Sequence, residues 1–173
     1  MDAFEAISKR ISVRNFQEKL VPKDSLGKIL EAARLAPTAI NKAPVHFIVV
    51  TDPEKRKKLA GQFSKFLAKA PLAIIGCGDT LSSPHWYKVD VAIAMQNMVI
   101  AATGEGLGTC WIGSFNGAQI KADYKIPERF EVIALLAVGY PVEGRLAGGT
   151  FGLIRRRKKL EDIVSYEEYG SNV

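Results

Sequence analysis

Cysteine and histidine are scarce in this chain of 173 residues, which contains two of each. Cys77 and Cys110 do not form a CxxC pair, and His46 and His85 do not cluster with cysteine or acidic residues. Because zinc sites draw on such clusters, we do not expect one here. Both cysteines lie in apolar stretches, where we expect buried thiols.

Long hydrophobic runs are also missing. The longest uncharged stretches, residues 91–104 and 106–120, are shorter than a membrane span requires and contain glycine or polar residues. The first residues, MDAFE, lack the basic and apolar regions of a secretory signal. We therefore expect a soluble, cytoplasmic protein without a membrane partner.

Several common catalytic motifs are absent, including the Walker A sequence and the GxSxG elbow. The glycines at 104–108 do not complete a GxGxxG pattern, because Thr109 and Trp111 occupy the positions where the last glycine is needed. This stretch also follows a predicted helix and precedes a predicted strand, the reverse of the dinucleotide-binding order. A helix cap followed by a turn is the better interpretation.

The composition that remains, 47% hydrophobic and 24% charged, is typical of a globular protein. The length fits a single domain over residues 1–173. From about residue 140 the pattern weakens, and residues 140–173 resemble an arm that needs another surface to pack against.

Apolar periodicity predicts helices over residues 2–11, from Pro22 to Pro37, and over 52–70, 87–103 and 119–124. It predicts strands over residues 46–51, 71–78, 108–113 and 131–139. The strand at 71–78 is hydrophobic throughout, which indicates a central place in the sheet. The helix at 87–103 is apolar around most of its circumference, so it is buried in the core or between two subunits. For a domain of this size we expect a subunit interface.

Residues 10–14, RISVR, alternate between polar and apolar side chains. In an extended backbone Arg10, Ser12 and Arg14 would point to one face, about 7 Å apart in succession. Two guanidinium groups and a hydroxyl at this spacing can bind a phosphate, because the arginine fork pairs with phosphate oxygens. A solvated basic segment is the alternative interpretation.

A second basic cluster, residues 155–159, places Arg155 and Arg157 on one face of an extended chain. If the two ends of the chain meet, four arginines would surround one anion. A basic surface for nucleic acid or another acidic partner is the rival hypothesis. Its basic residues are few and are not interleaved with aromatic side chains that could stack on bases, so we expect no nucleic acid partner.

Four motifs, in this order, together resemble the FMN-dependent nitroreductase family over nearly the whole chain. They are RISVR at 10–14 followed by Phe16, APTAINKAP at 36–44, GLGTCWIG at 106–113, and a basic cluster before LEDIV at 160–164. The resemblance implies an α+β fold with a mixed central sheet flanked by helices. It also implies an intertwined homodimer, in which the C-terminal strand is exchanged between subunits and two FMN sites lie at the interface.

The resemblance also implies roles for individual residues. The two arginine-rich segments would hold the FMN phosphate and ribityl end. The loop at 37–41 would reach the flavin from the other subunit, Gln62 would lie near the flavin edge, and the strand at 111–113 would lie along the ring. The residues implied as FMN-binding are Arg10, Ile11, Ser12, Arg14, Pro37, Thr38, Ala39, Asn41, Gln62, Trp111, Ile112, Gly113, Arg155 and Arg157.

The activity that the resemblance implies is an NAD(P)H-dependent oxidoreductase with a ping-pong cycle. NADH or NADPH would deliver hydride to the flavin and leave, and a nitro compound, a quinone or a related small-molecule acceptor would then take its place. The cofactor carries the chemistry, so no catalytic side chain or metal is expected. An FMN-binding protein with little turnover is the alternative. Thr38, Ala39 and Ala43 depart from the usual family residues, which leaves the acceptor open.

Overall fold

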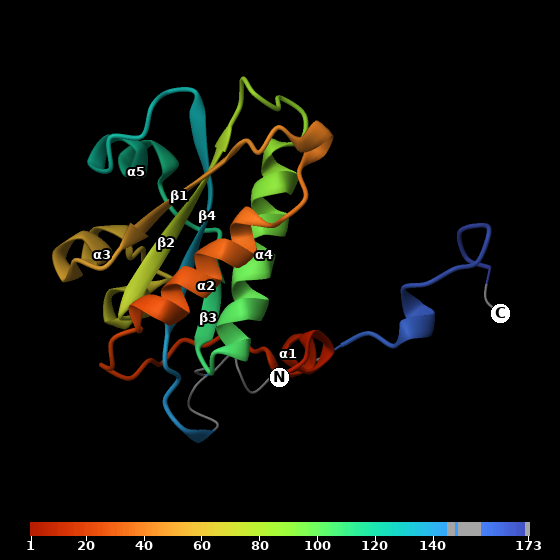
Figure 1. The fold of residues 1–173 in the computed structure, drawn as a ribbon, viewed down its shortest axis with the longest axis horizontal. Helices are drawn as coiled ribbons and strands as arrows, with labels where there is room; N and C mark the ends of the chain where they lie inside the picture. The colour runs from red at the N-terminus through yellow and green to blue at the C-terminus, as the bar shows by residue number, and fades with distance from the viewer. Residues whose placement is uncertain (145–147, 149–156, 172–173) are drawn as a thin grey trace.

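Four strands form one sheet in the computed structural model, which describes residues 1–144, 148 and 157–171. They are β1 (Val45–Val50), β2 (Leu72–Asp79), β3 (Gly108–Ile112) and β4 (Phe130–Gly139). Their order across the sheet is β1-β2-β4-β3 (Figure 1). The prediction that residues 71–78 form a central strand is confirmed, because β2 lies between β1 and β4.

The prediction of a mixed sheet is wrong for these four strands. Each neighbouring pair, β1 with β2, β2 with β4 and β4 with β3, is antiparallel. The physical reason lies in the helical crossover from β2 to β3. These two strands run in the same direction, but β4 lies between them and runs the other way. A parallel pairing that the described residues do contain is the isolated bridge between Ser12 and Thr109.

The helices agree with the predicted elements except at two places. They are α1 (Ala3–Lys9), α2 (Lys23–Arg34), α3 (Pro53–Leu59), α4 (Tyr87–Gly104) and α5 (Gly117–Asp123), with short 3₁₀ turns η1 (Ala39–Asn41), η2 (Lys65–Lys69) and η5 (Leu160–Asp162). The first helix ends at Lys9, because Arg10 already has an extended backbone with φ −54° and ψ 130°. The predicted helix at 52–70 is two pieces, α3 and η2, separated by a turn.

That turn is held by Ser64, which is buried. The Gly61 backbone N–H donates to the Ser64 hydroxyl at 2.9 Å, and the Ser64 N–H donates to the Gly61 carbonyl at 3.1 Å. A serine that bonds the neighbouring backbone in this way stabilises a turn at the expense of helix. The helix therefore stops at Leu59.

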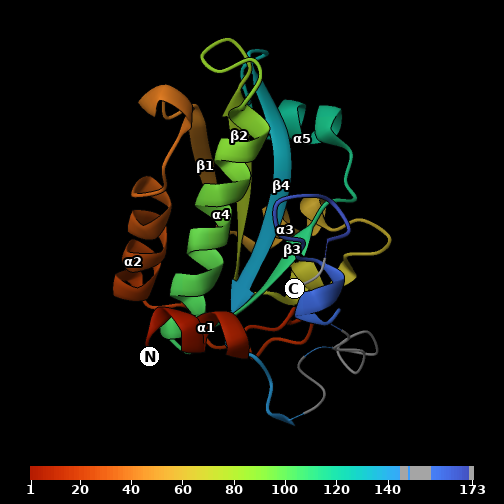
Figure 2. The same ribbon diagram turned by 90° about the vertical axis from the view of Figure 1, so that its right-hand side faces the viewer.

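Helices cover both faces of the sheet (Figures 1 and 2). Leu72 and Ile74 of β2 face a core that they share with α2 and α4. Ala73 and Ile75 face a second core, which α3, η2 and α5 complete. This alternation along β2 explains why residues 71–78 are apolar without interruption. Both cysteines are buried, as predicted.

Helix α4 lies in the first core and also has an exposed apolar stripe. Met95 and Met98 are fully buried, whereas Val89 is 45% exposed and Ile93 is 37% exposed. Together with Lys88, Ala92, Gln96 and Asn97, the two exposed residues line a shallow hollow of about 500 Å³. The sequence predicted that this helix lies either in the core or between two subunits. Both can hold, because one side of the helix is in the core and the other side is exposed and apolar. Among the described helices, none is long and apolar enough to cross a membrane.

The C-terminal arm, here residues 157–171, extends away from the sheet and its helices (Figure 1). All of its residues are exposed, including Leu160, Ile163 and Tyr166. An extended segment with exposed apolar side chains has no core of its own.

Candidate functional site

The arginine ladder, defined as Arg10, Ser12 and Arg14, runs along β3. Ser12 forms a parallel bridge with Thr109, and the Val13 N–H donates to the Thr109 carbonyl at 2.8 Å. Val13 is buried at 2% exposure, which fixes the segment on the body of the protein. The backbone is thus extended where the alternating sequence predicted it.

The ladder and Cys110 influence each other electrostatically. Burial raises the pKa of the Cys110 thiol, whereas the charges of Arg14 and Arg10 and a hydrogen bond with Ser12 act to lower it. The charges of both ladder arginines therefore extend to Cys110 in β3.

A pocket of about 160 Å³ opens beside the ladder. Its lining is Arg14, Phe63, Ser64, Phe66, Cys110, Trp111, Ile112, Gly113 and Ser114. The pocket brings Arg14 of the ladder together with the predicted FMN-binding residues at 111–113. Trp111 is half-buried and packs against the core between the sheet and α4. A Cβ built on Gly113 would meet open space, so the backbone at this point is accessible to a ligand.

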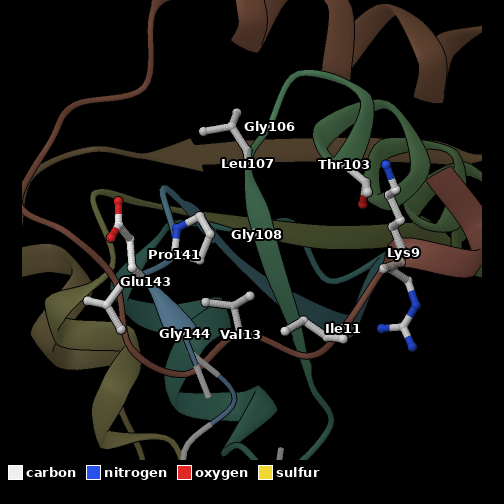
Figure 3. A pocket seen from close by; sticks show the side chains of 12 residues that line it. Lys9, Ile11, Val13, Thr103, Gly106, Leu107, Gly108, Pro141, Glu143 and Gly144 are labelled. Atoms are coloured by element: carbon white, nitrogen blue, oxygen red, sulfur yellow. The ribbon is translucent and has the colours of Figure 1, made fainter. Parts of the chain in front are cut away.

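A larger hollow of about 390 Å³ lies on the other side of the extended segment (Figure 3). Ile11 and Val13 lie side by side next to Gly108, with Lys9 and Glu143 on opposite sides (Figure 3). Arg10 and Ile11 both line this hollow, and neither lines the pocket that Trp111 lines. Ile11 was predicted to contact FMN, but the structure does not bring its side chain to that pocket.

The predicted loop residues Pro37, Thr38, Ala39 and Asn41 lie at the other end of α4. The Ala39 N–H donates to the Asp90 carboxylate at 3.0 Å, and Asp90 is in the first turn of α4. The ladder lies beside β3, which begins just after α4 ends at Gly104. A helix of 18 residues is about 27 Å long, so one chain does not bring the loop and the ladder together.

The loop has an unusual backbone. Ile40, Asn41 and Ala43 have positive φ angles of 53°, 55° and 46°. Such conformations cost roughly 1–3 kcal/mol each in residues other than glycine, and they concentrate at functional sites. Ile40 is 88% exposed, so packing within this chain does not compensate its strain.

Three predicted FMN-binding residues remain to be placed: Gln62, Arg157 and Arg155. Gln62 is exposed in the turn before η2, next to Phe63, which lines the smaller pocket. Arg157 is exposed at the start of the C-terminal arm, and its place beside the ladder stays a prediction. Arg155 lies outside the described residues.

The sequence prediction missed Phe63, Phe66 and Asp90. Both phenylalanines line the smaller pocket, and Phe63 is 82% exposed. An exposed aromatic side chain directly after the glycine of a turn was an available signal for a binding surface. No group of three metal-ligating side chains occurs among the residues that the structure describes.

Gly108 allows the ladder to approach β3. A Cβ at this position would lie 2.4 Å from Val13 Cγ2 and 2.8 Å from Val13 Cβ. We expect Gly108→Ala to lower the free energy of unfolding by about 1–3 kcal/mol, because the clash forces the backbone apart. Gly27→Ala is the control: nothing lies within 4 Å of its Cβ in α2, so stability should rise by about 0.5–1 kcal/mol. Denaturant unfolding measures both, and equal effects would contradict the assigned contact.

Comparison with known proteins gives a consistent result. The profile of the Nitroreductase family matches residues 7–73 and 62–140. A Methanothermobacter thermautotrophicus protein that carries the name NADH dehydrogenase/NAD(P)H nitroreductase is 36% identical over 83% of this chain and 79% of its own. A Bacillus subtilis protein named FMN reductase [NAD(P)H] is 26% identical over 96% of this chain and 74% of its own.

The fold agrees as well. The solved structure of an FMN-dependent nitroreductase from Clostridium difficile superposes with a TM-score of 0.83 at 29% identity, covering 96% of this chain and 99% of that one. The profile match alone extends over more than half of the chain. The chain belongs to the nitroreductase family.

Proposed function

We propose that the chain is an FMN-dependent oxidoreductase that uses NADH or NADPH to reduce nitro compounds, quinones or related acceptors. The observation that carries this proposal is the arginine ladder beside β3, whose Arg14 lines the same pocket as Trp111 and Gly113. The names of the relatives, FMN reductase and FMN-dependent nitroreductase among them, support the same cofactor.

The ladder fits a phosphate monoester. Arg10 and Arg14 flank Ser12 in the segment that runs along β3, so two guanidinium groups and a hydroxyl lie within five residues. A phosphate carries about −1.5 to −2 charges at neutral pH. Charge-assisted bonds from guanidinium forks are well suited to hold it. Arg155 and Arg157 would complete the phosphate site from the C-terminal arm.

The pocket fits a flat ring only in part. Its volume is about 160 Å³, whereas pockets that bury a ligand of drug size usually measure about 300–1,000 Å³. The missing wall would come from a second copy of the chain. The loop at 37–41 lies a helix length away from the ladder, so it would contribute to the site of the partner subunit. We therefore propose a homodimer with two FMN sites at its interface.

Two exposed apolar surfaces support this assembly. One is the stripe on α4 that contains Val89 and Ile93, and the other is the C-terminal arm with Leu160 and Ile163. In the proposed dimer the arm exchanges between subunits and packs on the partner. Exposed apolar surface of this extent is typical of protein interfaces.

FMN supplies the two-electron redox chemistry when it is bound. The residues of this chain would bind and orient it: the ladder would hold the phosphate, Trp111 would lie along the ring, and the open space at Gly113 leaves backbone accessible. Burial raises the pKa of the Cys110 thiol, which disfavours a thiolate nucleophile at this position. Phe63 is exposed at the mouth, where NAD(P)H and then the acceptor would bind in turn in a ping-pong cycle.

The visible spectrum of the purified protein tests the proposal. We expect a yellow protein that is bleached by NADH or NADPH without oxygen and regains its colour when a nitroaromatic compound or a quinone is added. A preparation that stays colourless when FMN is supplied would overturn the cofactor assignment. Colour that is bleached only over hours would favour the alternative function, an FMN-binding protein with little turnover.

A further inference from the structure

Asp90 is a buried acidic residue in the first turn of α4, with 2% of its surface exposed. One carboxylate oxygen, Oδ1, accepts the Ala39 N–H at 3.0 Å. The other, Oδ2, is buried and has no hydrogen-bond partner among the residues that the structure describes. Burying a carboxylate with so few partners is unfavourable, so its presence calls for a role.

The turn at residues 38–43, which Asp90 contacts, is strained. Its internal hydrogen bonds join Asn41 N to the Thr38 carbonyl at 3.0 Å and Ala43 N to the Thr38 hydroxyl at 2.9 Å. They do not relieve the positive φ angles of Ile40, Asn41 and Ala43. A β-branched residue such as isoleucine is a marked outlier in this region of backbone space. A turn of this kind persists when its surroundings hold it in place.

The bond from Ala39 to Asp90 joins this turn to α4. The helix is fixed by its buried side, where Val91 and Met95 are fully buried in the core. The position of the turn is thereby coupled to a rigid element. As a result Ile40 and Asn41 point outward, and Ile40 is 88% exposed.

We propose that Asp90 is a positioning residue for the flavin site: it holds the turn at 38–43 so that the turn can contact the flavin of the partner subunit. This inference rests on the proposed function. The contact is indirect, because Asp90 itself is buried behind the turn. A one-ångström misplacement of such an element can lower a rate by about 100-fold.

Two substitutions in the full-length protein test this role. Asp90→Ala removes the acceptor, and we expect kcat/KM for the acceptor to fall by about 10- to 100-fold, with a changed visible spectrum of the bound flavin. Asp90→Asn keeps an oxygen that can accept the Ala39 N–H, so it should recover most of the activity and the spectrum. An asparagine variant as impaired as the alanine variant overturns the hydrogen-bonding role.

Asp79→Ala is the matched control. Asp79 also accepts backbone N–H groups, from Leu81 at 3.0 Å and Ser82 at 3.2 Å, but in a different turn. We expect this variant to lower the thermal unfolding temperature without changing flavin affinity or spectrum. If Asp90→Ala behaves in the same way, Asp90 is only a stabilising residue and the proposal is wrong.

Ala39→Pro removes the same hydrogen bond from the donor side. Thr38 has φ −133° and ψ 154°, a conformation that a following proline accepts, and Ala39 is the first residue of η1. If the bond is the cause, the double variant with Asp90→Ala should be no worse than the more impaired single variant. Fully additive losses would contradict the coupling.

The outcomes separate this inference from the proposed function. A wild-type protein that binds no FMN ends the proposed function and the inference together. A wild-type protein that binds FMN and is reduced by NAD(P)H, while Asp90→Ala matches it in kcat/KM and spectrum, ends this inference alone.

Discussion

Replacing Arg10 and Arg14 together with alanine is expected to weaken FMN binding by about 100-fold or more. Hydrogen bonds to a charged group contribute about 1.5–3 kcal/mol each, and each 1.4 kcal/mol corresponds to a factor of ten in the dissociation constant. The two side chains are two of the four arginines proposed to hold the phosphate, so losing both removes much of its counter-charge. Quenching of flavin fluorescence on titration measures the affinity.

Two controls make this result specific. Lys9→Ala removes a positive charge that pairs with Glu5 outside the ladder, and it should leave FMN affinity unchanged. Lysine in place of both ladder arginines keeps the charge but not the fork, so an intermediate affinity is expected. Wild-type affinity in the double alanine variant, with folding verified by circular dichroism, would show that the phosphate binds elsewhere.

Removing the C-terminal arm by truncation after Gly144 is expected to convert the dimer into a monomer. This cut keeps the bridge between Phe16 and Pro141 and the bond from Val142 N to the Asn15 carbonyl, but it removes Gly148, whose carbonyl accepts a hydrogen bond from Arg14 Nη1 at 3.3 Å. Within the described residues it also removes the segment 157–171, whose apolar side chains are exposed in the single chain. Sedimentation velocity at micromolar concentration gives the oligomeric state, and a truncated protein that is still dimeric refutes the exchange of the arm.

A full-length variant tests the same interface without truncation. Leu160 and Ile163 are 74% and 64% exposed in the single chain, so replacing both with serine should hardly alter the stability of a monomer. If they pack on the partner, the dimer dissociation constant should rise by about 30-fold, which corresponds to about 2 kcal/mol. An unchanged constant would leave the arm without a role in assembly.

Much of the fold follows from local patterns in the sequence. The uninterrupted apolar run at 71–78 predicted a strand with both faces covered, and β2 has that environment. The alternation at 10–14 predicted the extended ladder. These features can be read from a short stretch of sequence, because successive side chains of a strand point to opposite faces and the buried face is apolar.

The errors arose where a distant or side-chain interaction decides the structure. Apolar periodicity continued through residues 60–64, but the bonds between Gly61 and Ser64 end the helix. The sheet was expected to be mixed, whereas the place of β4 between β2 and β3 depends on the order of strands in space. No local pattern records that order.

The site was predictable to the extent that it is built from contiguous motifs. Arg14, Trp111 and Gly113 line one pocket and come from two short motifs, at 10–14 and 106–113. Asp90 was visible in the sequence as an acidic residue at the head of an otherwise nearly uncharged helix. Its partner, Ala39, is 51 positions away, and only the folded chain reveals that contact.

The placement of the loop and the ladder at opposite ends of α4 makes genetic complementation possible. In a twofold-symmetric dimer, each site would take its ladder from one copy and its loop from the other. Mixing subunits that lack the arginines with subunits that carry Asp90→Ala would produce heterodimers with one undamaged site and one site that carries both defects. Two impaired variants would then form heterodimers with up to half of the wild-type activity.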